Sequence, residues 1–104
     1  MANGYWIGRI DVANPEGYKE YVGPASVAVG KFGGRFLARG GKYECVEGNA
    51  RARNVILEFP SYEAALACWH SPEYRAAAAI RERNSQGDFI VMEGYDGPQP
   101  ENSR

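Results

Sequence analysis

Four short stretches of the chain alternate apolar and polar side chains or are rich in aromatic and β-branched residues. Both patterns are typical of strands, in which successive side chains point to opposite faces. The predicted strands cover residues 5–12, 35–39, 53–59 and 88–94. The sequence therefore predicts a sheet of four strands.

The segment after the first strand has apolar residues at three- and four-residue spacing, as in a helix that buries one face. Asn14 is the expected N-cap, with Pro15 in the first helical position. Pro24 interrupts the pattern, because proline removes a backbone donor and crowds the preceding turn. We therefore expect two helical segments with a kink, at residues 15–23 and 24–32.

A second helical region follows the third strand. Ser61 is the expected cap of a helix over residues 62–69, and Ser71 caps the next helix, which begins at Pro72. The alanine-rich run at 74–83 is a strong helix former. The region is therefore predicted to be two helices with a break between them.

Glycines and polar residues mark the connections. Residues 33–34 are expected to end the first helical region, and residues 40–41 to form a bulge or bend after which the strand continues over 42–46. Turns are predicted at 47–49 and 86–87.

The predicted order is strand, helix, strand, strand, helix, strand. This is the α+β, ferredoxin-like βαββαβ pattern, with an antiparallel four-stranded sheet and helices on one face only. At this length we expect one domain over residues 1–95, followed by a polar C-terminal tail at 96–104.

The two faces of the predicted sheet differ in character, because alternate residues of a strand share a face. One set is apolar and is expected to pack under the helices: Trp6, Gly8, Ile10, Phe36, Ala38, Val55, Leu57, Phe59, Ile90 and Met92. The other set mixes apolar and charged residues: Tyr5, Ile7, Arg9, Asp11, Arg35, Leu37, Arg39, Asn54, Ile56, Glu58, Phe89, Val91 and Glu93. This open face is too apolar to leave in water, so we expect a second copy of the chain to cover it in a homodimer.

Composition narrows the classes of function. The formal net charge is −1 with interspersed charges, so no nucleic-acid partner is expected. No apolar run approaches the ~18 residues of a membrane span, and no signal peptide is visible, so we expect a cytoplasmic protein. Cys45 and Cys68 form neither a disulfide framework nor a metal-site pattern, and we expect no metal and no cofactor.

Several motifs together resemble a known family. They are Arg39-Gly40-Gly41, Glu58-Phe59-Pro60-Ser61 and Ser71-Pro72-Glu73-Tyr74. At this spacing the chain, up to Tyr95, resembles the family called domain of unknown function 1330, in the dimeric α+β barrel group. The resemblance implies a homodimer whose two sheets enclose a cavity. The group includes cofactor-free monooxygenases, isomerases, haem enzymes and stress-responsive binding proteins, so the resemblance implies architecture more than chemistry.

Charged residues assigned to the open face are the first site candidates. Arg39 could clamp a carboxylate or enolate oxygen with its planar fork of donors, or could pair internally with Glu58 or Glu93. Glu58 could act as a general base, or as the structural partner of Arg9 or Arg39. Arg9 and Glu93 could likewise contact a substrate, or could serve only as structural partners in ion pairs.

Three further residues complete the predicted site. His70, the only histidine, could act as an acid–base group or could be a polar residue at a helix end. Tyr21 and Trp69, with Tyr18 and Tyr74 beside them, could line the mouth of a pocket, although aromatic residues at helical spacing are more often part of a core. Three functions stay open: a cofactor-free enzyme on a small anionic or aromatic metabolite, a small-ligand-binding or stress-response module, and a structural homodimer without ligand.

Overall fold

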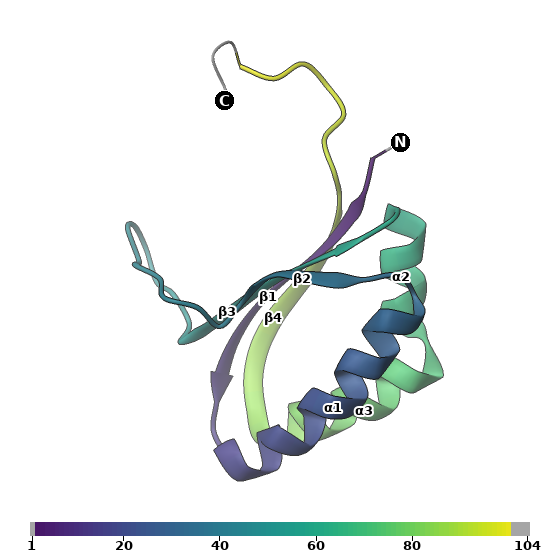
Figure 1. The fold of residues 1–104 in the computed structure, drawn as a ribbon. Coiled ribbons are helices and arrows are strands. Elements are labelled where there is room, and N and C mark those ends of the chain that lie inside the picture. The colour runs from purple at the N-terminus through teal and green to yellow at the C-terminus, as the bar shows by residue number, and fades with distance from the viewer. Residues whose placement is uncertain (1, 101–104) are drawn as a thin grey trace.

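Three helices cover one face of a four-stranded antiparallel sheet and leave the other face open (Figure 1). The structure is a computed structural model that describes residues 2–100. In chain order the elements are β1 (Gly4–Val12), α1 (Pro15–Lys31), β2 (Arg35–Arg39), β3 (Arg53–Phe59), α2 (Tyr62–His70), α3 (Pro72–Asn84) and β4 (Ser85–Glu93). The strand order is β2-β3-β1-β4. The predicted ferredoxin-like α+β fold is confirmed.

The break between α2 and α3 lies where the sequence predicts it. The Ser61 hydroxyl accepts a hydrogen bond from the backbone N–H of Ala64 at 3.0 Å, which caps α2. The Ser71 hydroxyl accepts from the backbone N–H of Tyr74 at 3.1 Å and donates to the carbonyl of Cys68 at 2.8 Å. One serine therefore closes α2 and opens α3, which fixes the angle at which the two helices meet.

The expected division of α1 at Pro24 is wrong, because a single helix runs from Pro15 to Lys31. Pro24 has no N–H to donate to the carbonyl of Glu20, and both residues are exposed, so water can reach that carbonyl. Solvation of this kind lets the helix continue through the proline.

The loop between β2 and β3 also differs from expectation. Residues 42–46 form no strand, and residues 86–87, expected as a turn, belong to β4. Strand β4 begins directly after α3 because its pairing with β1 extends to the Val12–Ser85 pair. The bend expected at residues 40–41 is present at Gly40, where φ is +65°, and a further irregularity lies inside β2, where the register shifts between Phe36 and Ala38.

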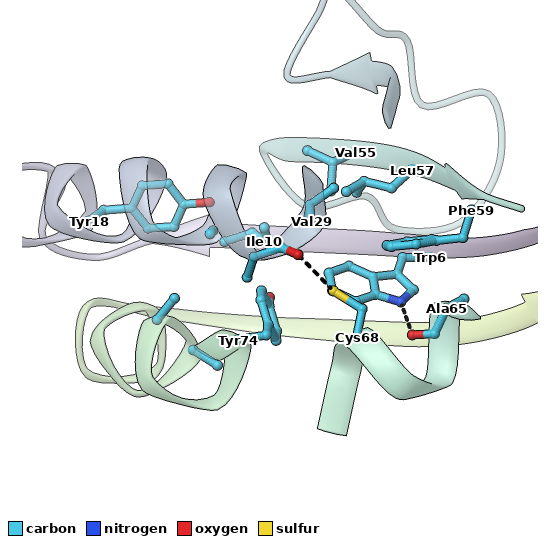
Figure 2. Close-up of a cluster of buried hydrophobic side chains, with 14 residues drawn as sticks. Trp6, Ile10, Tyr18, Val29, Val55, Leu57, Phe59, Ala65, Cys68 and Tyr74 are labelled. Atoms are coloured by element: carbon cyan, nitrogen blue, oxygen red, sulfur yellow. Dashed lines mark hydrogen bonds between the residues drawn. The ribbon is translucent and has the colours of Figure 1, made fainter. Parts of the chain in front are cut away.

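Trp6, the third residue of β1, is the centre of the core. Only 1% of its surface is exposed, and its indole N–H donates to the carbonyl of Ala65 in α2 at 2.9 Å (Figure 2). Its ring lies 5.0 Å from that of Phe59, 5.2 Å from that of Trp69 and 4.7 Å from that of Tyr74. One side chain thus joins the sheet to both C-terminal helices.

The face assignment of β4 is reversed from the prediction. Val91 pairs with Trp6 and Phe89 pairs with Gly8, so both pack under the helices. Ile90 and Met92 lie on the open face and are 54% and 52% exposed. The open face therefore stays apolar, with different residues from β4 than expected.

We expect Trp6→Phe to destabilise the protein more than Trp69→Phe does. The Trp6 variant loses the indole hydrogen bond to α2 and leaves unfilled volume, which together cost about 1–3 kcal/mol. Trp69 is only partly buried, and its indole N–H has no hydrogen-bond partner within residues 2–100. Urea unfolding of both variants checks this; equal losses would contradict the central role of Trp6.

Candidate functional site

A narrow cavity lies between α1 and the helix-covered face of the sheet. Its volume, counted as positions open to the centre of a water molecule, is about 30 Å³. Its walls are formed by Trp6, Ile10, Tyr18, Tyr21, Val22, Ala25, Val29, Phe36, Arg39, Arg53, Val55, Leu57 and Phe89. The lining is aromatic and aliphatic except for two arginines and two tyrosine hydroxyls, a composition that suits a small-molecule site.

The bulge in β2 brings Arg39 to this cavity. Because the register shifts after Phe36, Arg39 pairs with Val55, whose side chain is buried under the helices. The Arg39 guanidinium stacks 3.9 Å above the centre of the Phe36 ring and donates to the Ser26 hydroxyl of α1 at 3.2 Å. Arg39 is exposed and therefore lies at the opening of the cavity, bridging β2 and α1.

Arg53, at the start of β3, is the second cation of the lining. It pairs with Ile10 in β1, which places it on the helix side. Its guanidinium lies 5.8 Å from the centre of the Tyr18 ring, and its buried Nε atom has no hydrogen-bond partner within residues 2–100. A Cβ atom at Gly40 would collide with this guanidinium, so glycine leaves room for the arginine.

Tyr21 contributes a hydroxyl that is held inside the protein. It lies 2.7 Å from the Tyr74 hydroxyl, with either group able to donate. Burial, followed by the neighbouring Tyr74 group, raises the pKa of Tyr21. Burial also raises the pKa of Tyr74, although the nearby Arg81 opposes the rise. Both groups therefore remain protonated at neutral pH and act as hydrogen-bond donors and acceptors.

Glu58 lies on the opposite face of the sheet, away from Arg39, although the sequence placed the two on one face. It accepts hydrogen bonds from Arg35 at 2.9 Å, Tyr5 at 3.0 Å and Asn3 at 3.1 Å. The bond from the Arg35 guanidinium is the largest cause of a lowered pKa at this carboxyl. Glu58 and Arg39 do not form the expected pair because the bulge turns Arg39 to the helix side.

The remaining predicted residues lie apart from one another. Arg9 is on the open face, 3.5 Å from Asp88, so its partner is not Glu58. His70 is exposed at the end of α2, and Glu93 is exposed at the end of β4. Trp69 lines a separate groove where α3 meets β4.

A comparison with known families shows which family the chain belongs to. Residues 3–95 match the domain of unknown function DUF1330. The chain belongs to the DUF1330 family. No curated protein matches the sequence.

Three solved structures resemble this DUF1330 protein. A protein of unknown function from Rhodopseudomonas palustris superposes with a TM-score of 0.72 at 16% identity, covering 92% of this chain and 85% of that chain. SnoaB, a cofactor-independent oxygenase from Streptomyces nogalater, gives 0.64 at 12% identity, covering 99% and 100% of the two chains. A protein from Bacteroides thetaiotaomicron described as a possible oxidoreductase gives 0.58 at 11% identity, covering 88% and 97%. At these identities the likeness establishes a shared fold.

The described part of the DUF1330 chain contains no helix suited to crossing a membrane and no cluster of metal-binding side chains. Among residues 2–100, none of the helices combines the length and apolar character required to cross a bilayer. Within the same residues, no three histidine, cysteine or carboxylate side chains lie together as a group that could hold a metal ion.

The structure adds residues that the sequence prediction did not select. Arg53 lines the cavity, and Arg81 is buried beside Trp69. The alternation of β3 already placed Arg53 with Val55, Leu57 and the other apolar residues of that strand. An arginine on an otherwise apolar face was therefore an available signal. No comparable signal in the sequence points to Arg81, because this residue lies in a run of charged residues at the end of α3.

We expect Glu58→Gln to remove a pH-dependent part of the protein's stability. The folded-state pKa of Glu58 lies below its ordinary value of 4.5. Ionised Glu58 therefore gives its full stabilisation of the folded state above pH 4.5. This stabilisation is lost as the pH falls through the lowered pKa of Glu58. The free energy of unfolding should differ between variant and wild type near pH 7, and the difference should shrink as the pH falls below 4.5.

Glu93→Gln is the matched control. Glu93 is an exposed carboxylate of β4 that has no side-chain hydrogen bond or ion pair within residues 2–100. Its variant should follow the wild-type pH profile. If the free energy of unfolding of Glu58→Gln depended on pH as that of wild type does, the lowered pKa of Glu58 would be contradicted.

Proposed function

We propose that this DUF1330 protein binds a small organic anion at the cavity between α1 and the sheet. The cavity itself, about 30 Å³, has room for about one or two water molecules, so binding requires α1 and the sheet to separate around the ligand. The observation that carries the proposal is the presence of two arginines, Arg39 and Arg53, in a lining that is otherwise apolar except for the hydroxyls of Tyr18 and Tyr21. Neither has a carboxylate partner within residues 2–100. A mostly apolar hollow with a few convergent polar groups is the usual form of a small-molecule site.

An anion would satisfy groups that the folded chain leaves without partners. The Nε–H of Arg53 is buried and unbonded, and a buried unsatisfied donor costs about 1–3 kcal/mol. Hydrogen bonds to charged groups contribute about 1.5–3 kcal/mol, and the planar guanidinium matches a carboxylate or enolate. The two cations therefore favour a negatively charged ligand over a neutral one.

The lining favours binding over proton abstraction. No carboxylate or imidazole belongs to it, and the pKa of Tyr21 is raised, so no group there acts as a base at neutral pH. Glu58 and His70, the proton-transfer candidates of the sequence, lie outside the cavity. Binding is accordingly the first function that the geometry supports.

A cofactor-independent catalyst is the second candidate. The likeness to SnoaB, a cofactor-independent oxygenase, extends over 99% of the chain and supports this alternative at the level of the fold. In such an enzyme the substrate would enter already as an anion, and Arg39 and Arg53 would stabilise its charge. No base from the protein is needed for that step.

The open face supports assembly into a homodimer, as a dimeric α+β barrel. Ile56, Ile90 and Met92 lie on it with 38%, 54% and 52% of their surfaces exposed. The charges around them are already paired within the chain: Glu58 with Arg35, and Arg9 with Asp88. A second sheet could therefore cover the apolar centre without burying unpaired charges.

We expect Arg53→Met to weaken binding of a small carboxylate, with propionate as the probe, by about tenfold or more, because each charge-assisted hydrogen bond contributes over 1 kcal/mol. The indole signal of Trp6, which lines the cavity, reports binding in an NMR titration. Arg83→Met removes the same charge at an exposed site on α3 and should bind like wild type. Equal binding by both variants would rule out the cavity site.

We expect Ile56→Asp to convert the dimer into a monomer, because it introduces a charge at the centre of the apolar face. Val27→Asp is the control, since Val27 lies on α1, on the far side of the molecule, and is 67% exposed. Sedimentation velocity at micromolar concentration measures the mass. A wild-type protein that sediments as a single subunit would contradict the assembly.

A further inference from the structure

A second hollow lies where α3 passes into β4, on the far side of Phe89 from the cavity. It is a groove of about 540 Å³, with walls that include Trp69, Arg81, Ser85 and Phe89. Phe89 lines both hollows, and its ring lies over Gly8, where any Cβ atom would collide with it. The ring therefore forms the wall between the cavity and the groove.

Arg81 is the unusual residue of this groove. It is 5% exposed, although arginine is almost never buried without a partner. Its guanidinium carbon lies 4.4 Å from the centre of the Phe89 ring, 5.6 Å from that of Tyr21 and 5.9 Å from that of Trp69. The cation is thus enclosed by aromatic rings, which attract it but do not neutralise it.

No carboxylate compensates the Arg81 charge. Its buried Nε–H has no hydrogen-bond partner within residues 2–100, and none of the ion pairs there includes it. The acidic residue next to it in the chain, Glu82, lies 4.0 Å from Arg75 instead. The Tyr74 hydroxyl hydrogen-bonds with Arg81 but is neutral and does not compensate its charge, so the fold maintains a buried cation that an anion would stabilise.

The other charges of the groove limit the kind of anion. Arg51, which also lines the groove, is bound by Asp11 at 2.8 Å and by Asp88 at 2.9 Å, so its charge is already compensated. Glu82 also lines the groove and disfavours a ligand with two negative charges. One uncompensated cation remains, and it matches a single carboxylate.

We propose that Arg81 anchors the carboxylate of a small aromatic acid in this groove, a second site distinct from the cavity beneath α1. The guanidinium edge fits a carboxylate with two parallel hydrogen bonds. The rings of Trp69 and Phe89 provide the wall against which the aromatic body of the ligand packs. The groove volume lies within the range of small-molecule sites, about 300–1,000 Å³.

The test is a titration of the full chain with benzoate, and with benzamide as the uncharged analogue, followed by the NMR signal of the Trp69 indole. Wild type should bind benzoate and not benzamide. Arg81→Met should weaken benzoate binding by about tenfold or more, whereas Arg81→Lys should retain part of it. Arg83→Met removes the same charge at an exposed position of α3 and should bind benzoate like wild type.

Stability gives a second, independent readout. A buried charge without a partner destabilises the folded state, so Arg81→Met should unfold at the wild-type temperature or above it. A Tm well below wild type, with benzoate binding unchanged, would show that Arg81 serves only the fold and would overturn the proposal.

A third variant separates the two sites. Arg53→Met alters the cavity and should leave benzoate binding at Trp69 unchanged. Loss of that binding in Arg53→Met, with no loss in Arg81→Met, would place benzoate in the cavity and overturn the groove site alone. Equal binding of benzoate and benzamide would also overturn it, because the carboxylate would then play no part.

Discussion

The hydrogen bond from Trp6 to Ala65, together with the rings around the indole, determines how the helices lie on the sheet. The bond joins β1 to the first turns of α2, at 2.9 Å and away from water. Trp69 and Tyr74 pack against the same indole from either side of the break at Ser71. The position of α3, and with it that of Arg81, depends on this cluster, because Ser71 fixes how α3 leaves α2.

The sheet separates two kinds of charged residue. On the open face, carboxylates and arginines are paired, as in the Glu58–Arg35 and Arg9–Asp88 bridges. On the helix side, Arg39, Arg53 and Arg81 have no carboxylate partner within residues 2–100. Paired charges suit a surface that meets another protein surface, whereas unpaired cations in aromatic surroundings suit a ligand. The β2 bulge places Arg39 on the helix side, whereas the alternation of β3 places Arg53 there and α3 carries Arg81.

Much of the fold followed from local signals in the sequence. The element order, the two serine caps and the break before Pro72 depend on residues adjacent in the chain, and the structure contains all of them. The side of Arg39 could not be predicted, because one extra residue in β2 reverses the alternation that the prediction assumed. In β4, Phe89 to Met92 are all apolar, so alternation could not tell the buried face from the open one; only pairing with β1 decides it.

The candidate site was harder to predict than the fold, because it depends on which cations remain unpaired. A sequence does not show that Arg51 takes both nearby carboxylates, Asp11 and Asp88, and leaves Arg81 with none. A small domain has little stability to spare, since about 5–15 kcal/mol separates folded from unfolded chains. Keeping uncompensated arginines in its interior is difficult to explain by stability, because an apolar residue of similar size would fold at least as well. The proposed ligand binding would give these cations a role that folding alone does not provide.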